Sequence, residues 1–151
     1  MSDVSREPRA IIPFLQPFYD VVGPLAWPIV RIAAGWNMIV HGYAKILRGM
    51  EKQAEMLAHD GLNFGIWFAQ FLTVVELGGG IFISLGLLTR FWAAALAIEL
   101  GYITFVIYWH NGFSWTSRGY EYTLMWGLIC LAIALRGGGP YSLDRLIRRE
   151  L

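Results

Sequence analysis

Long apolar runs with few charges alternate along this chain with short polar stretches. Four of these runs reach or approach the roughly 20 mostly apolar residues that an α-helix needs to cross a bilayer. The four runs cover residues 22–47, 64–88, 91–109 and 118–136. Residues 89–90 connect the second run to the third, and Gly137 and Pro140 end the fourth, because glycine closes helices and proline cannot continue one. The pattern therefore predicts an all-α integral membrane protein, a four-helix bundle that forms a single domain over residues 1–151.

Both ends of the chain carry shorter amphipathic segments. In the segment 143–151 the leucines and the isoleucine share one helical face and the arginines the other, and Ser142 is placed to cap this short helix. Near the N-terminus, Phe14, Leu15 and Phe18 repeat at helical spacing. The pattern predicts short interfacial helices at both ends of the bundle, and the alternative is that these segments are frayed tails.

Small residues predict where the helices touch. Gly35 and Gly42 lie seven residues apart on the first run, and residues 78–80 of the second run are three glycines. Such residues let helix backbones approach closely in a membrane. The glycine run indicates either close packing or a backbone opened toward a ligand, and we expect packing.

The composition agrees with a membrane protein and excludes some functions. Hydrophobic residues make up 56% of the chain and charged residues 15%, against about 45–50% and about 25% in soluble domains. A net charge of +1 argues against a nucleic-acid partner. Cys130 is the single cysteine, which rules out an internal disulfide and dithiol chemistry. Residues 1–16 lack a compact apolar core with a small-residue cleavage site, so no removable signal peptide is expected.

The distribution of Lys and Arg predicts the orientation in the membrane, because cytoplasmic ends carry more of them. The side that holds both termini and residues 89–90 carries Arg6, Arg9, Arg90, Arg136, Arg145, Arg148 and Arg149; the opposite side carries Lys45, Arg48, Lys52 and Arg118. We therefore expect a multi-pass membrane protein with both termini in the cytoplasm and the loop 48–61 outside.

Three ionisable residues lie deep inside the predicted spans, where an unpaired charge costs roughly 2.5–3.5 kcal/mol. They are Arg31, Glu76 and Glu99. Arg31 and Glu99 should lie ~10 Å and ~12 Å from the same membrane face, at about 1.5 Å per helical residue. Their similar depth predicts a structural ion pair between them. Glu76 lies near the midplane, within reach of either layer.

A second polar group is expected in the outer half of the bundle. His41 and Lys45 lie one turn apart on one helical face, and Glu76 and Glu121 reach the same layer from other helices. We expect these four residues to border one polar pocket, which either binds a ligand and handles protons or only stabilises the bundle. No metal site is expected, because the histidines and carboxylates lack HxxxH or ExxH spacing.

Glycines and polar residues follow one another in a recognisable order from about Ile29 to Leu146. In chain order they are Arg31, Gly35, His41-Gly42, Lys45, Gly61, Glu76, Gly79, Gly86-Leu87-Leu88-Thr89-Arg90, Gly119-Tyr120-Glu121 and Gly139-Pro140-Tyr141-Ser142-Leu143-Asp144. This ordered set resembles the DoxX family of small bacterial membrane proteins. The resemblance implies four helices and a location in the bacterial inner membrane. It also implies an association with redox chemistry, since the family takes its name from the small membrane subunits of an archaeal thiosulfate:quinone oxidoreductase. Glu99 is not part of the pattern that the family shares.

Three functions are open at this point. The first is a redox-associated subunit that binds a quinone through His41, Lys45 and Glu76, with no covalent cofactor, and leaves electron transfer to a partner. The second is a purely structural subunit of a larger membrane complex, and the third a small transporter or lipid-binding protein that uses the polar core as a pathway. We favour the first two jointly, an accessory subunit near quinone chemistry. The expected partners are the lipid bilayer and either other membrane subunits or further copies of the chain.

Overall fold

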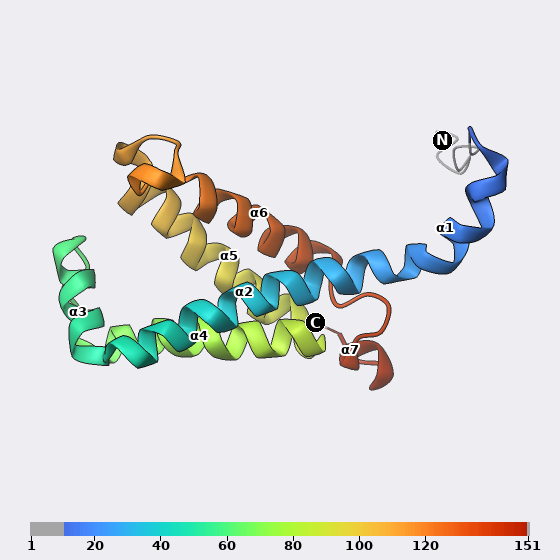
Figure 1. Ribbon diagram of the computed structural model, residues 1–151. Helices are drawn as coiled ribbons and strands as arrows, with labels where there is room; N and C mark the ends of the chain where they lie inside the picture. Colours follow the sequence, from blue (N-terminus) through green and yellow to red (C-terminus); the bar gives the residue numbers. More distant parts are fainter. Residues whose placement is uncertain (1–10, 151) are drawn as a thin grey trace, which may run out of the picture.

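The computed structural model describes residues 11–150, and every regular element in that range is helical (Figure 1). The long helices are α2 (Ala26–Arg48), α4 (Ile66–Leu85), α5 (Thr89–Tyr102) and α6 (Glu121–Arg136). The shorter elements are α1 (Gln16–Val22), α3 (Met50–His59), α7 (Leu143–Leu146), the π-helical segment η3 (Ile103–Tyr108) and the 3₁₀ turns η1 (Pro13–Leu15), η2 (Gly23–Leu25), η4 (Trp109–Asn111) and η5 (Trp115–Ser117). The predicted all-α class is confirmed.

Each predicted apolar run contains one long helix. By length and composition, α4 and the helical stretch Thr89–Asn111 could each cross a membrane. The first run was predicted to begin at residue 22, whereas α2 begins at Ala26, because η2 forms a separate turn around Pro24. The helix α3 was not predicted. It lies in the loop between the first two runs and buries Gln53 and Leu57.

Short helices are present near both ends of the described chain. α7 follows Ser142, whose Oγ accepts a hydrogen bond from the backbone N of Arg145 at 3.2 Å, so the predicted cap is confirmed. α7 ends at Leu146, earlier than the apolar pattern suggests, and Leu151 lies outside the described residues. Residues 1–10 also lie outside them. They include most of the segment for which we predict no signal peptide and two of the arginines counted for orientation.

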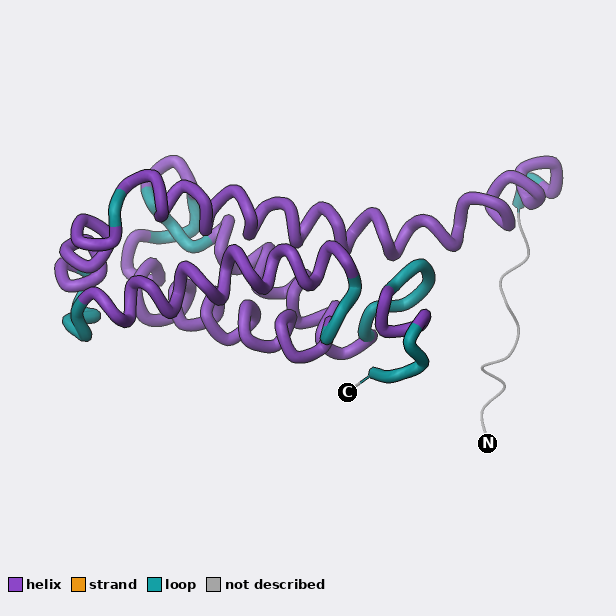
Figure 2. Tube along the Cα trace, turned by 90° about the horizontal axis from the view of Figure 1, so that it is seen from below, coloured by secondary structure: helices purple, strands orange, loops and turns teal. Residues whose placement is uncertain are grey.

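The long helices form two antiparallel pairs, α2 with α4 and α5 with α6 (Figure 1). The pairs lie close together near α7 and diverge toward α3. Seen from below, α1 and η2 continue α2 beyond the other helices (Figure 2). α1 and α7 therefore lie at one end of the molecule, which we call the clamp end, and α3 lies at the other, which we call the open end.

Glycines bring α2 and α4 into backbone contact. A Cβ atom on Gly80 would lie 2.6 Å from the backbone O of Gly35, and one on Gly42 would lie 2.7 Å from the backbone N of Leu77. Neither position has room for a larger residue, so the expected packing role is confirmed for Gly80. The apolar core that these contacts support contains Ala34, Met38, Val75, Ile83, Ala93, Leu96, Leu100, Cys130 and Ile133.

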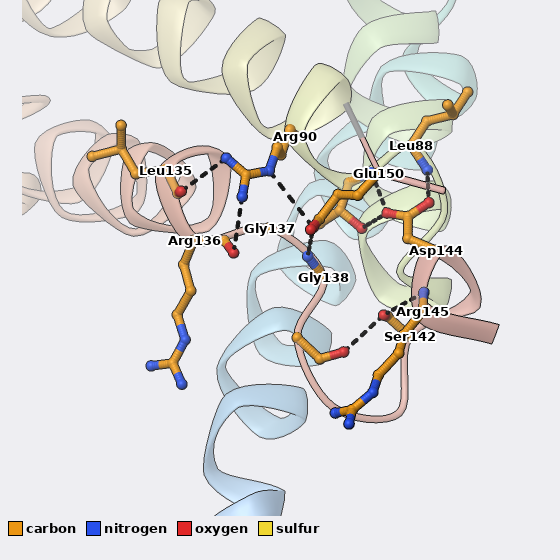
Figure 3. Close-up of polar contacts among 12 residues, drawn as sticks. Leu88, Arg90, Leu135, Arg136, Gly137, Gly138, Ser142, Asp144, Arg145 and Glu150 are labelled. Carbon is orange, nitrogen blue, oxygen red and sulfur yellow. Dashed lines mark hydrogen bonds and ion pairs between the residues drawn. The ribbon is translucent and has the colours of Figure 1, made fainter. Parts of the chain in front are cut away.

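Segments far apart in the sequence are joined at the clamp end by hydrogen bonds, which we call the C-terminal clamp (Trp27, Arg31, residues 86–89 and residues 137–144). The carboxylate of Asp144 accepts hydrogen bonds from the backbone N of Leu88 at 2.7 Å and from the N and Oγ1 of Thr89 at 3.0 Å and 2.6 Å (Figure 3). The backbone N of Asp144 donates to the O of Gly86 at 2.8 Å. Since the first amides of a helix have no intrahelical acceptor, Asp144 caps α5 from 55 residues away.

Two side chains of α2 bind the glycine-rich segment that follows α6. Arg31 donates from Nη1 to the O of Gly138 at 2.6 Å and from Nη2 to the O of Tyr141 at 3.0 Å. Trp27 donates from Nε1 to the O of Gly137 at 2.9 Å. The clamp therefore connects α2, the turn between α4 and α5, and the chain after α6.

We predict that Asp144→Ala lowers the free energy of unfolding by about 3 kcal/mol, because it leaves the buried donors of Leu88 and Thr89 without an acceptor. Asp20→Ala is the matched control, since Asp20 is an exposed carboxylate at the same end. Thermal unfolding in mild detergent measures both. Equal melting temperatures for the two variants would show that the clamp contributes nothing to stability.

Candidate functional site

A cavity of about 1060 Å³ lies between the two helix pairs at the open end. Its lining comes from the second half of α2, from α3, from the first half of α4, from α5 with η3, and from the start of α6. Apolar and aromatic side chains form most of the wall, among them Phe68, Phe71, Leu72, Ile98 and Ile103. The cavity exists because the pairs diverge here, whereas they are packed together at the clamp end.

One lysine and two glutamates from three different helices meet in this wall. Lys45 Nζ lies 2.8 Å from Glu76 Oε2 and 3.9 Å from Glu99 Oε1. The glutamate side chains are only 7% and 5% exposed. Both carboxylate oxygens of Glu99 are buried and accept no hydrogen bond from any described residue. We call Lys45, Glu76 and Glu99 the charged cluster.

The direction of helical side chains explains this meeting. Side chains lean toward the N-terminus of their helix, so Lys45, near the end of α2, leans into the bundle. α4 runs antiparallel to α2, and Glu76 in its middle therefore leans toward Lys45. The predicted proximity of Lys45 and Glu76 is found in the structure.

The predicted ion pair between Arg31 and Glu99 was wrong. Arg31 leans toward the clamp end, where carbonyl oxygens bind it, and Glu99 faces Lys45 instead. The depths also differ more than expected. Arg31 lies five residues into α2, or about 7 Å, and Glu99 ten residues into α5, or about 15 Å.

A second polar group of the cavity centres on Tyr122, which the sequence analysis missed. The Tyr122 hydroxyl lies 2.9 Å from Nε2 of His41 and donates a hydrogen bond to Oδ1 of Asn37 at 2.8 Å. We call Asn37, His41 and Tyr122 the tyrosine cluster. The position of Asn37 one turn before His41 was a usable signal, because residues four apart share a helical face. Tyr122 carried no comparable signal, since an aromatic residue in an apolar run is ordinary.

Glu121 is not part of the cavity, so that prediction was wrong. It is the first residue of α6, and its Oε2 accepts a hydrogen bond from the backbone N of Trp115 at 3.2 Å. A carboxylate is stable at this position because the start of a helix carries positive partial charge. The next residue along the helix, Tyr122, faces the cavity in its place.

The cavity offers hydrogen-bond donors on an apolar surface. Lys45 and His41 can each donate to a carbonyl oxygen, and the Tyr122 hydroxyl can do so when it rotates away from Asn37. Among residues 11–150, no three His, Cys, Asp or Glu side chains converge in a way that could hold a metal ion. The arrangement suits an organic ligand with an apolar body and a small number of acceptor atoms.

Comparisons with known proteins place this chain among bacterial membrane proteins. The model of the DoxX family matches residues 26–109, a stretch that includes His41 and the whole charged cluster. The inner membrane protein YqjF of Escherichia coli (strain K12) is 30% identical over 135 residues, which cover 86% of this chain and 92% of the relative. An uncharacterized protein of Haemophilus influenzae (strain Rd) is 31% identical over 124 residues, which cover 80% and 90%. No solved structure matches the chain.

We predict that the stability changes of Arg31→Met and Glu99→Gln add within about 0.5 kcal/mol in the double variant, because the two side chains share no contact. The matched control is the pair Lys45→Met and Glu99→Gln, whose effects should not add, since these side chains lie 3.9 Å apart. Unfolding in detergent measures both cycles. Coupling of 1 kcal/mol or more between Arg31 and Glu99 would contradict the observed arrangement.

Proposed function

The chain belongs to the DoxX family, and we propose that it is a multi-pass protein of the bacterial inner membrane that binds a quinone-type lipid as an accessory subunit of membrane redox chemistry. The proposed spans are α2, α4, the stretch Thr89–Asn111 and α6, with both termini in the cytoplasm. In this proposal the chain holds the quinone and a partner protein carries the electrons.

The outer faces of the long helices support four spans. Exposed large apolar side chains occur on all four helices, and several of them are 60% to 74% exposed. Examples are Ile29, Trp36, Val74, Ile98 and Leu135. Such surfaces are unfavourable in water and are readily solvated by lipid tails.

The positions of the terminal helices α1 and α7 support the orientation. α1 and α7 lie at the same end of the molecule (Figure 1). Exposed arginines gather at this end, including Arg136, Arg145, Arg148 and Arg149. An excess of Arg marks the cytoplasmic side, so the clamp end is assigned to the cytoplasm and the open end with its cavity to the outer half of the bilayer.

We predict that a cysteine replacing exposed Glu55 of α3, on a Cys130→Ala background, reacts with a membrane-impermeant thiol reagent in intact cells. Arg145→Cys on the same background is the matched control and should react only after the cells are permeabilised. Gel-shift labelling measures both. The opposite pattern would invert the proposed topology.

The composition of the cavity carries the ligand proposal. Its volume of about 1060 Å³ lies at the upper end of typical ligand sites, at roughly 300–1,000 Å³, and its wall is mainly apolar. A quinone presents two carbonyl acceptors on a ring that bears an apolar tail. Lys45 and the tyrosine cluster supply donors for the carbonyls, and the aromatic wall of α4 and η3 accommodates the ring and tail.

We predict that Tyr122→Phe weakens binding of a short-chain ubiquinone about five- to tenfold, the loss expected for one hydrogen bond of ~1 kcal/mol. Tyr43→Phe is the matched control, because Tyr43 is an exposed tyrosine of α2 outside the cavity. Quenching of tryptophan fluorescence in lipid nanodiscs measures the affinity. Absence of saturable binding, or equal affinity in wild type, Tyr122→Phe and Lys45→Met, would remove the quinone proposal. Mass spectrometry of lipids that co-purify with the protein then tests a phospholipid ligand.

A further inference from the structure

The charged cluster contains one cation and two potential anions in a nearly closed environment. Lys45 Nζ contacts Glu76 at 2.8 Å and Glu99 at 3.9 Å, and neither carboxylate is more than 7% exposed. With all three groups ionised the cluster carries one net negative charge. An uncompensated buried charge is strongly unfavourable, and a group in that position neutralises when it can.

Within the described part of the chain, no second cation forms an ion pair with the charged cluster. Among residues 11–150, Lys45 is the one basic residue that lies within 4.0 Å of Glu99. Of the other basic residues in the wall, Arg48 donates to Oε1 of Gln53 at 2.7 Å, and Arg118 lies over the ring of Tyr108 at 5.9 Å. His41 is held by Tyr122 at 2.9 Å.

The remaining titratable groups around the cluster do not add positive charge either. Asp60 in the cavity wall is a further acid, and the phenols of Tyr102, Tyr108 and Tyr122 cannot be cations. On α6, Cys130 carries a buried thiol, which cannot be a cation. Among the described residues, Lys45 is therefore the one cation in ion-pair contact with the two carboxylates, and it can pair closely with only one of them.

We propose that Glu76 and Glu99 share one exchangeable proton around Lys45, which makes the charged cluster a proton-binding site in the wall of the cavity. Glu76, which contacts the ammonium at 2.8 Å, remains ionised. Glu99 lies farther from Lys45 and has no hydrogen-bond partner among residues 11–150, so it carries the proton. The positive charge of Lys45 and the negative charge of Glu76 then cancel, and the cluster has no net charge.

The geometry favours a proton over a metal cation. A monovalent or divalent metal ion needs several oxygen ligands converging on one point. Here the ammonium of Lys45 occupies the position between the two carboxylates and would repel such an ion. A proton needs only one carboxylate oxygen, and both glutamates line the cavity through which it would exchange.

This site goes beyond quinone binding and does not depend on it, because the charge imbalance exists whatever the cavity holds. Infrared spectroscopy of the protein in lipid nanodiscs, without added quinone, tests it. Wild type should show the C=O stretch of a protonated carboxylic acid at neutral pH, shifted to lower frequency in D₂O. Glu99→Gln and Glu76→Gln should each abolish this band, because Lys45 then pairs with the one glutamate that remains. Lys45→Met should strengthen it, since both carboxyl groups then bind protons.

Glu121→Gln is the matched control and should leave the band unchanged, because Glu121 lies outside the cavity. Circular dichroism and size-exclusion profiles identify variants that fold. Either glutamine variant decides the test alone if Lys45→Met does not fold, since glutamine keeps the size of glutamate. Absence of the band in wild type, or its persistence in the glutamine variants, would overturn the proposal. Loss of the band on adding sodium chloride at constant pH would assign the site to a metal cation instead.

Discussion

The C-terminal clamp is the constraint on which the rest of the structure depends. Asp144 caps α5 through Leu88 and Thr89, and Arg31 binds the carbonyls of the chain that follows α6. All four long helices are thereby tied together at one end, through contacts that satisfy backbone groups with no intrahelical partner. Because only this end is tied, the helix pairs can diverge at the other, and the cavity occupies the space between them.

The buried charges of the clamp and of the charged cluster are stabilised in two different ways. Arg31 is solvated by carbonyl oxygens, which are dipoles, and the carboxylate of Asp144 in the same clamp lies near enough to favour its positive charge. Lys45 lies between two carboxylates. The charge of Glu76 balances that of Lys45, and Glu99 is a second carboxylate that the lysine does not neutralise. The first arrangement is fixed by geometry and suits a structural role. The second has one carboxylate more than charge balance requires, which is why it is the one capable of exchanging a proton.

The sequence was sufficient for the helices and for part of the site. Length and hydropathy locate α2, α4, α5 and α6 because a long apolar run has few alternatives, and helical spacing joins His41 to Lys45. Depth along a helix was insufficient for pairing Arg31 with Glu99, because it ignores the direction in which each side chain leans. Glu121 failed for a related reason, since a shift of one position at a helix start changes the face a residue occupies.

Contacts between distant segments were beyond reach of the sequence alone. The sequence shows a motif around Thr89 and another around Asp144. Neither motif indicates that the two segments, 55 residues apart, are joined by hydrogen bonds. α3 was missed because half of its ten residues are polar, and only the cavity beside it explains why Gln53 and Leu57 are buried.

The π-helical segment η3 explains how α5 can serve both ends of the molecule. Up to Tyr102 the helix packs against α4 and α6, and Ala93 and Leu96 are fully buried there. A π-helix widens the turn and shifts the facing of every later residue, which brings Ile103, Ile107 and Tyr108 to the cavity wall. Thr104 stays attached to α6 through a 2.8 Å hydrogen bond to Thr123. The cavity wall already includes Ile98 and Glu99 of α5, and the change of helix type at Ile103 extends it along η3. One helix therefore holds the core together and still lines the cavity.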